Sequence, residues 1–157
     1  MNEEMPEFDL HAFFPYQVRV FYRTVSQSVT EVYARRHGLS VQEWRVMAVM
    51  GNDQPMAAGD LVEKSSMDKV QISRALKRLE ETGLLHRRED PADRRRVILT
   101  LTDQGNAIFR ELVPLVLKLE QDLLAGLDAK ERASLLGLME KVKANAERAM
   151  SAEKQEP

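Results

Sequence analysis

Three consecutive arginines, Arg94, Arg95 and Arg96, follow Asp93 in the segment EDPADRRRVILTLTDQG at residues 89–105. Guanidinium groups bind phosphate oxygens, and they are attracted to a narrow minor groove of DNA, where the negative potential is enhanced. A carboxylate beside a guanidinium can pair with it and hold it extended before DNA binds. We therefore predict that Asp93 braces an arginine and that the three arginines contact DNA. The alternative is a flexible charged loop whose arginines are incidental.

A second set of basic and polar side chains lies in residues 68–82, which have the spacing of a helix. The apolar stripe of this helix is formed by Ile72, Ala75, Leu76 and Leu79. At about 100° per residue, Val70, Arg74 and Lys77 point away from that stripe. Such a face can read base edges in a major groove, with Arg for guanine, Gln for adenine and Val for a thymine methyl. The predicted DNA contacts here are Lys69, Gln71, Ser73, Arg74, Lys77 and Arg78, and the alternative is an ordinary solvated helix surface.

Positive charge is concentrated in this part of a mildly acidic chain. Residues 68–96 contain nine Lys or Arg against six Asp or Glu, whereas the whole chain has a net charge of −2. The residues outside that segment therefore carry a net charge of −5. A local excess of positive charge is what a phosphate backbone requires, so the charge distribution favours DNA binding over a merely solvated surface.

The rest of the sequence offers little for catalysis or for a cofactor. The chain has no cysteine, and His11, His37 and His86 are too far apart in sequence to suggest a metal site. Phosphate-binding glycine loops and nucleophile motifs are absent from its 157 residues. We therefore expect no cofactor and no enzyme. An acidic N-terminus and the lack of a long apolar run predict a cytoplasmic protein with no membrane partner.

The first predicted element is a long helix over residues 10–36, whose apolar residues recur every three or four positions and form one face. It is followed by shorter helices that include 57–64, a hairpin, and two further helices. Capping-box spacings mark helix starts at Ser40, Asp68 and Asp128. We predict a mainly α (α+β) fold: a winged helix-turn-helix with long N- and C-terminal helices forming a dimerisation region. The expected parts of this single integrated domain are the N-terminal dimerisation helix (1–38), the DNA-binding lobe (39–101), the C-terminal dimerisation helices (102–150) and a polar tail (151–157).

Nearly the whole chain resembles the MarR family of bacterial transcription regulators. The resemblance is carried by FFPYQVRVFYR, LSVQEWRVMAVMG, AAGDLVEKSSMDKVQISRALKRLEETGLLHR and DPADRRRVILTLTDQG, whose D-x-R and T-x-x-G match the family's wing. It implies a homodimer on a pseudo-palindromic DNA site. In the wing, it implies that Asp93 braces Arg95 in the minor groove and that Arg94 and Arg96 contact phosphates. In the preceding helix, the residues that it implies to touch bases or phosphates are Lys69, Gln71, Ser73 and Arg74.

The resemblance also implies a small-molecule effector. Family members commonly bind aromatic acids or related anions between the dimerisation region and the DNA-binding lobe. The residues that border that cleft would be His11, Tyr16, Arg19, Arg23 and Trp44. An arginine beside aromatic rings suits an aromatic carboxylate. The alternative is that Arg19 and Arg23 pair with acids while Tyr16 and Trp44 belong to the core.

The leading hypothesis is therefore a sequence-specific, dimeric repressor of transcription that a small aromatic or anionic ligand releases from double-stranded DNA. A second hypothesis is a helical adaptor or assembly protein whose basic face binds an acidic protein partner. The adaptor hypothesis does not explain why a basic hairpin tip lies beside the helix. An enzyme is third, because no nucleophile–base pair or metal cluster can be named.

Overall fold

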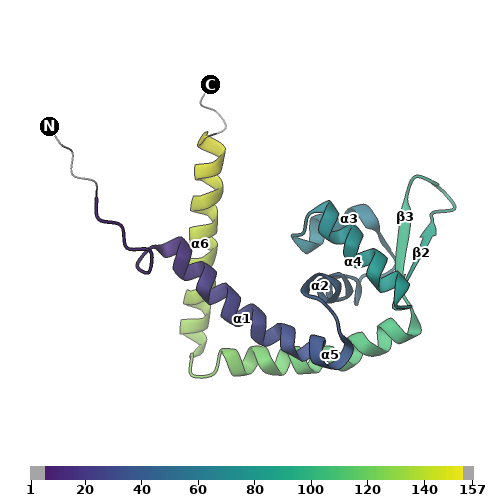
Figure 1. The fold of residues 1–157 in the computed structure, drawn as a ribbon, viewed down its shortest axis with the longest axis horizontal. Helices are drawn as coiled ribbons and strands as arrows, with labels where there is room; N and C mark the ends of the chain where they lie inside the picture. Colours follow the sequence, from purple (N-terminus) through teal and green to yellow (C-terminus); the bar gives the residue numbers. More distant parts are fainter. Residues whose placement is uncertain (1–5, 154–157) are drawn as a thin grey trace. The chain divides into compact units, whose positions relative to one another are not determined.

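The computed structural model describes residues 6–153 and divides the chain into two compact units, Met1–Leu119 and Glu120–Pro157. Within the described residues there are six helices and one three-stranded sheet (Figure 1). The first unit contains helices α1 to α4, the sheet and most of α5. This content confirms the mainly α class with a winged helix-turn-helix.

Helix α1 (Phe14–His37) begins four residues later than predicted, because residues 10–12 form a turn. Pro15 lies in the first turn, where a missing N–H is tolerated, and Gly38 ends the helix with a positive φ of 65°. The predicted apolar face is only half-covered within this chain. Val25 and Val29 are partly buried, but the N-terminal half of the helix exposes large apolar side chains, which include Phe14, Val18 and Phe21.

The helix-turn-helix consists of α2 (Val41–Met50), α3 (Ala58–Ser65) and α4 (Lys69–Glu81). The capping box predicted for α2 is present: the Glu43 backbone N–H donates to Ser40 Oγ at 3.2 Å, and the Ser40 N–H donates to Glu43 Oε2 at 2.8 Å. Helices α2 and α4 pack on a shared core together with α3. Its fully buried side chains include Val46, Met47, Met50, Leu61 and Leu79.

The sheet has the order β1-β3-β2, and all neighbours are antiparallel. Strands β2 (Leu85–Glu89) and β3 (Val97–Leu101) form the predicted hairpin, with Leu85 opposite Leu101 and Glu89 opposite Val97. This hairpin and its connecting loop, residues 85–101, are the wing. Strand β1 (Met56–Ala57) was not predicted, and residue 57 was wrongly assigned to the following helix. Two residues are too few to show the alternation that marks a strand, so only the pairing with β3 reveals it.

Helix α5 (Asp103–Leu123) starts in the first unit, and α6 (Ala129–Glu153) belongs to the second. A further capping box starts α6, where Asp128 and Glu131 each accept from the other's backbone N–H at 2.8 Å. The Arg132 side chain donates to the carbonyl oxygens of Leu124 and Leu127, at 3.1 Å each. Across residues 6–153, no helix combines the length and the apolar character needed to cross a bilayer.

Candidate nucleic-acid interface

The start of helix α4 is stabilised by two side chains, one just before the helix and one in its first turn. Asp68 Oδ1 accepts from the backbone N–H of Gln71 at 2.8 Å, and the Asp68 N–H donates back to Gln71 Oε1 at 3.4 Å. This is the predicted capping box. It also means that the Gln71 amide oxygen is engaged at the helix start, while the amide nitrogen has no hydrogen-bond partner among the described residues.

The inward stripe of α4 is confirmed, because Ile72, Ala75, Leu76 and Leu79 are all buried. Consequently the polar face turns outward. The predicted DNA-contacting residues of this helix are all exposed: Lys69, Gln71, Ser73, Arg74, Lys77 and Arg78. Lys77 pairs with Glu81 at 3.8 Å. The structure thus brings these six residues together on one accessible helix surface, while their DNA contacts stay predictions.

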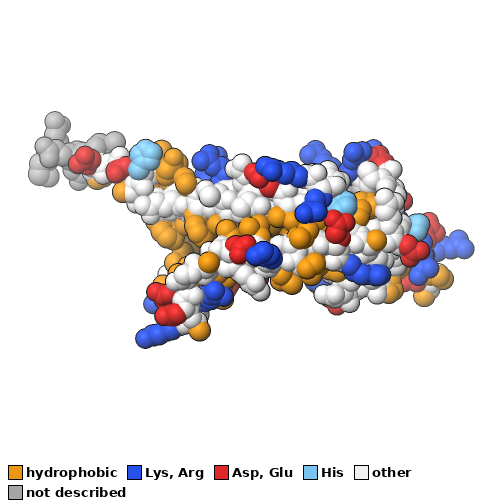
Figure 2. Space-filling view, turned by 90° about the horizontal axis from the view of Figure 1, so that it is seen from below, with side chains coloured by type: hydrophobic (Ala, Val, Ile, Leu, Met, Phe, Trp, Pro, Cys, Tyr) orange, Lys and Arg blue, Asp and Glu red, His pale blue; other side chains and the backbone are white. Residues whose placement is uncertain are grey.

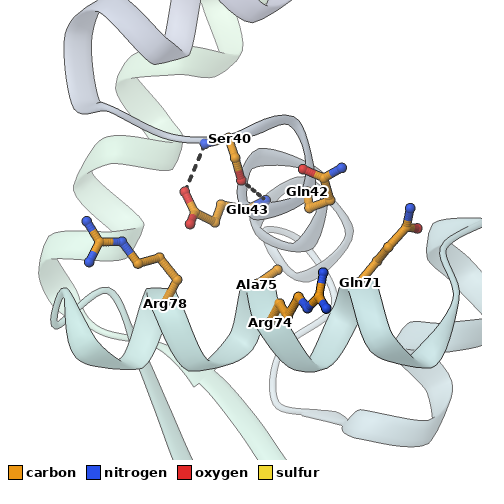
Figure 3. A pocket seen from close by; sticks show the side chains of 7 residues that line it. All are labelled: Ser40, Gln42, Glu43, Gln71, Arg74, Ala75 and Arg78. Atoms are coloured by element: carbon orange, nitrogen blue, oxygen red, sulfur yellow. Dashed lines mark hydrogen bonds between the residues drawn. The ribbon is translucent and has the colours of Figure 1, made fainter.

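A groove of about 440 Å³ lies between one flank of α4 and the start of α2. Arg74 and Arg78 extend from α4 at this groove, and Ser40 and Gln42 approach from α2 (Figure 3). Glu43 also lines it, but its carboxylate is held by the Ser40 N–H. Among the described residues, neither arginine side chain has an ion-pair or hydrogen-bond partner. The groove is therefore an open cationic surface, and no sequence pattern indicated that Ser40 and Gln42 would line it.

The wing loop is shaped by two aspartates that accept from the backbone. Asp90 Oδ1 accepts from the N–H of Ala92 at 2.9 Å, and Asp93 Oδ1 accepts from the N–H of Arg95 at 3.0 Å. The Asp93 carbonyl oxygen also accepts from the Arg96 N–H at 2.8 Å, which closes a turn. The predicted bracing of a guanidinium by Asp93 does not occur among the described residues. The carboxylate shapes the turn instead, as Asp side chains do two residues before an N–H.

Arg94, Arg95 and Arg96 are all exposed in this turn, and within residues 6–153 none of their guanidinium groups has a carboxylate partner. Lys and Arg side chains protrude at the end of the molecule that carries the wing (Figure 2). Arg95 and Arg96 also border a pocket of about 300 Å³ beside the start of α3, together with Gly59 and Asp60. The three arginines are therefore placed where a ligand outside the chain can reach them.

The T-x-x-G segment anchors the wing to α5. Thr102 Oγ1 accepts from the Gly105 N–H at 3.0 Å, and the same hydroxyl donates to the Gly83 carbonyl oxygen at 2.8 Å. The Thr102 backbone N–H donates to the Leu84 carbonyl oxygen at 3.1 Å. One threonine therefore caps α5 and ties its first turn to the chain that enters β2.

Within the described part of one chain, the residues implied for effector binding are not all brought together. His11 and Tyr16 contact each other edge to face, with ring centroids 5.4 Å apart, and Arg19 and Arg23 are exposed on α1. Trp44 instead stacks between two aromatic rings, at 5.6 Å from Tyr33 and 6.1 Å from Phe109. Trp44 is thus packed against the core, as in the alternative interpretation, while one edge of it lines a separate cavity.

That cavity has a volume of about 280 Å³ and lies between α1 and α2. Besides Trp44, its lining includes Tyr22, Tyr33 and the half-buried Arg45, but none of the four implied residues from the N-terminal end of the chain. Burial raises the pKa of Tyr33 from its ordinary value of 10.0, against the lowering effects of its hydrogen bond with Thr30 and the charge of Arg45. The Tyr33 phenol is therefore protonated at neutral pH. Arg45, directly after Trp44 in the sequence, is a cation at this cavity that no sequence pattern indicated.

The described residues contain no cluster of three or more His, Cys, Asp or Glu suited to a metal ion.

A sequence model of the MarR family matches residues 37–96. The chain is 27% identical to the uncharacterized HTH-type transcriptional regulator YdgJ of Bacillus subtilis, over 69% of this chain and 66% of that protein. It is 30% identical to the HTH-type transcriptional repressor NicR of Pseudomonas putida, over 56% of each chain. These alignments leave about a third or more of each relative's length unmatched.

Among solved structures, the PcaV transcriptional regulator of Streptomyces coelicolor, in complex with its natural ligand, has a similar fold. It superposes with a TM-score of 0.75 at 25% identity, over 90% of this chain and 99% of that one. A regulator from Acinetobacter sp. ADP1, described as MarR/EmrR family, gives a TM-score of 0.78 at 19% identity, over 90% and 99% of the two chains. The helix-turn-helix and most of the wing of this chain, within residues 37–96, thus match the MarR family, whose members are DNA-binding transcription regulators and not enzymes.

Proposed function

We propose that this protein is a transcriptional repressor that binds a pseudo-palindromic operator as a homodimer and leaves it when a small aromatic acid binds. The observation that carries the DNA-binding part is a set of exposed cations without carboxylate partners among the described residues. On α4 and the wing this set includes Lys69, Arg74, Arg78, Arg94, Arg95 and Arg96. Cations that are not neutralised within the protein are available to replace the counterions of a phosphate backbone.

In this proposal α4 enters a major groove and the wing follows the adjacent minor groove. The first turns of α4 then face base edges, as in other helix-turn-helix proteins. Lys69, Gln71, Ser73 and Arg74 contact bases or phosphates, and Lys77 and Arg78 contact the backbone. Arg95 enters the minor groove, while Arg94 and Arg96 bind its phosphates. Asp93 keeps Arg95 in place through the backbone turn. Residues 39–101 are thus the DNA-binding lobe.

Dimerisation is proposed for residues 1–38 and 102–150, because these segments expose apolar side chains. Apolar side chains lie open on the surface in Figure 2. The exposed large ones on α1 include Phe14 and Phe21, and those on α6 include Leu136, Leu138 and Met139. Several exposed large apolar side chains on one helix are typical of an interface. On one face of a duplex, the two α4 helices of a dimer must lie about 34 Å apart to reach successive major grooves.

The ligand part of the proposal rests on the cavity between α1 and α2. Tyr22 and Trp44 offer aromatic surface there, and Arg45 offers a guanidinium that suits a carboxylate. The similar PcaV structure contains a natural ligand, which supports a small-molecule role for this fold. A ligand releases DNA only if it binds the DNA-incompetent arrangement of the dimer more tightly than the competent one.

Fluorescence anisotropy with the DNA upstream of the protein's own gene tests the proposal. The logarithm of the binding constant should fall linearly with the logarithm of the salt concentration, with a slope of about −0.9 per phosphate neutralised. Sedimentation of the free protein should give twice the chain's mass of 18.0 kDa. Salt-insensitive or absent DNA binding, with binding to acidic proteins instead, would favour the adaptor hypothesis.

A further inference from the structure

Val70 is an exposed apolar residue in the middle of the chain, far in sequence from the other exposed large hydrophobic residues. Its side chain is 59% exposed. The other exposed large hydrophobic residues lie at Tyr22 or earlier, or at Leu117 or later. Of the described residues between those two positions, which include the whole DNA-binding lobe, Val70 is thus the only exposed large hydrophobic residue, since the others are buried or half-buried.

Val70 is the second residue of α4, so it lies in the turn that enters a major groove first in a helix-turn-helix protein. At about 100° per residue it lies almost opposite the centre of the buried stripe, between the directions of Arg74 and Lys77. It therefore occupies the most outward line of the helix. Single exposed hydrophobic residues are common on protein surfaces, but this one lies at the centre of the proposed reading face.

The helix itself does not need valine at this position. A β-branched residue in an exposed helix is less favourable than alanine, because its side chain loses rotamer freedom. Asp68 and Gln71 already start the helix through their capping box. The isopropyl group makes no contact with the buried stripe, which faces the other way. A role for Val70 must therefore come from something outside the chain.

In the major groove, the C5 methyl of thymine is the apolar feature among the donors and acceptors of the base edges. We infer that Val70 determines specificity by packing against a thymine methyl in each operator half-site, an inference that rests on the DNA binding proposed above. A protein partner fits this position less well. One isopropyl group among cations offers too little apolar area for a protein interface, whereas a single methyl suffices on DNA.

The neighbour of Val70 on the next turn refines the expected site. Arg74 follows at i+4, and side chains at that spacing have Cβ atoms about 5–6 Å apart. Base pairs are stacked about 3.4 Å apart along the duplex. The thymine that Val70 contacts should therefore lie one or two base pairs from the guanine or phosphate that Arg74 contacts. The half-site is predicted to contain a thymine methyl next to the Arg74 contact.

The test uses a duplex selected from random DNA by the full-length protein. Each thymine is replaced in turn by deoxyuridine, which removes only the C5 methyl, and binding is measured by anisotropy. For the wild-type protein, we expect a loss of about fourfold at one thymine in a half-site, the effect of one methyl group in an apolar contact. For Val70→Ala, the same replacement should have no effect.

Two further variants control this comparison. Val70→Thr keeps the branched shape but replaces one methyl with a hydroxyl, so it should show a smaller uracil effect than the wild type. Lys77→Ala weakens binding without touching Val70, so it should keep the fourfold effect. Circular dichroism of Val70→Ala should be unchanged, because the side chain is exposed.

The outcomes separate this inference from the function on which it rests. If uracil replacement weakens the wild type and Val70→Ala equally, or weakens neither at any position, Val70 does not read a methyl while DNA binding stands. If the protein selects no duplex at all, the proposed function fails, and the role of Val70 fails with it.

Discussion

The carbonyl oxygen of Leu84 occupies the space beside Gly105: a Cβ built on Gly105 would lie 2.2 Å from that oxygen and 3.1 Å from its carbon. Leu84 directly precedes β2, and Gly105 lies in the first turn of α5. The backbone that leads into the wing therefore runs directly against the helix that follows it. The glycine of the T-x-x-G segment is required by this close approach and not by an unusual φ angle.

Gly105→Ala should therefore destabilise the protein. The added methyl group collides with backbone, which cannot rotate away as a side chain could, so we expect a loss of about 1–3 kcal/mol. The measurement is urea unfolding followed by circular dichroism. Gly59→Ala in α3 is the matched control, because a Cβ there meets nothing within 4 Å. An equal effect of the two substitutions would contradict the packing at Leu84.

Two substitutions of Asp93 distinguish the effect of its negative charge from its role as hydrogen-bond acceptor in the turn. Asp93→Asn keeps a side-chain oxygen for the Arg95 N–H, so the turn should persist and DNA affinity should be equal or higher, since a negative charge has gone. Asp93→Ala loses the acceptor and should weaken binding despite the same change in charge. Anisotropy titrations compare them. Equal weakening by both variants would instead indicate that the carboxylate braces a guanidinium in the bound state.

Asp68 offers the corresponding test at the start of α4. Asp68→Ala removes the cap of the first turn and should cost about 1 kcal/mol of folding free energy. Because that turn carries the proposed base contacts, specific DNA binding should weaken as well. Asp68→Asn retains a capping oxygen and should be nearly as stable as the wild type. Thermal unfolding and DNA titration of both variants check this, and equal stabilities of the two variants would contradict it.

Arg95→Ala should weaken specific DNA binding roughly tenfold or more, because it removes the proposed minor-groove contact. Folding should be unaffected, since this side chain is exposed and the turn uses only the Arg95 backbone N–H. Arg95→Lys should retain more non-specific affinity than Arg95→Ala but less specificity than the wild type, since an ammonium group lacks the planar guanidinium. Competition titrations with non-specific DNA measure the difference. Unchanged specificity in Arg95→Ala would remove Arg95 from the site.

The effector cavity predicts a contrast between two arginines of the same region. Thermal stabilisation by aromatic acids should be lost in Arg45→Ala, because Arg45 lines the cavity. Arg19→Ala should keep it, since Arg19 is exposed on α1 and does not line that cavity. Screening by thermal shift and calorimetry gives both results. The reverse pattern would return the ligand site to the N-terminal end of α1.

The elements that the sequence predicted well are those determined by neighbours along the chain. The capping boxes at Ser40, Asp68 and Asp128 each involve residues three apart, and the α4 stripe recurs over a single helix. Asp93 shows the limit of such local reasoning. Pairing with a guanidinium and accepting from a backbone N–H are both local options, and only the path of the turn decides between them.

The features that the sequence did not predict depend on contacts between distant residues. Strand β1 exists because Met56 pairs with Leu99. The cavity beside Trp44 combines α1 and α2, and its arginine could be identified only once the two helices were placed together. The apolar face of α1 was correctly read as apolar, but its spacing could not show that its first half stays exposed within one chain.

Trp44 is the only tryptophan in the sequence, and it touches both the aromatic rings of α1 and α5 and the cavity. Indole emission responds to the polarity and mobility of its surroundings, and here all of the indole emission originates from this one position. The protein therefore carries an intrinsic optical reporter. Quenching or a spectral shift on titration would count ligand occupancy directly, without a label and without DNA.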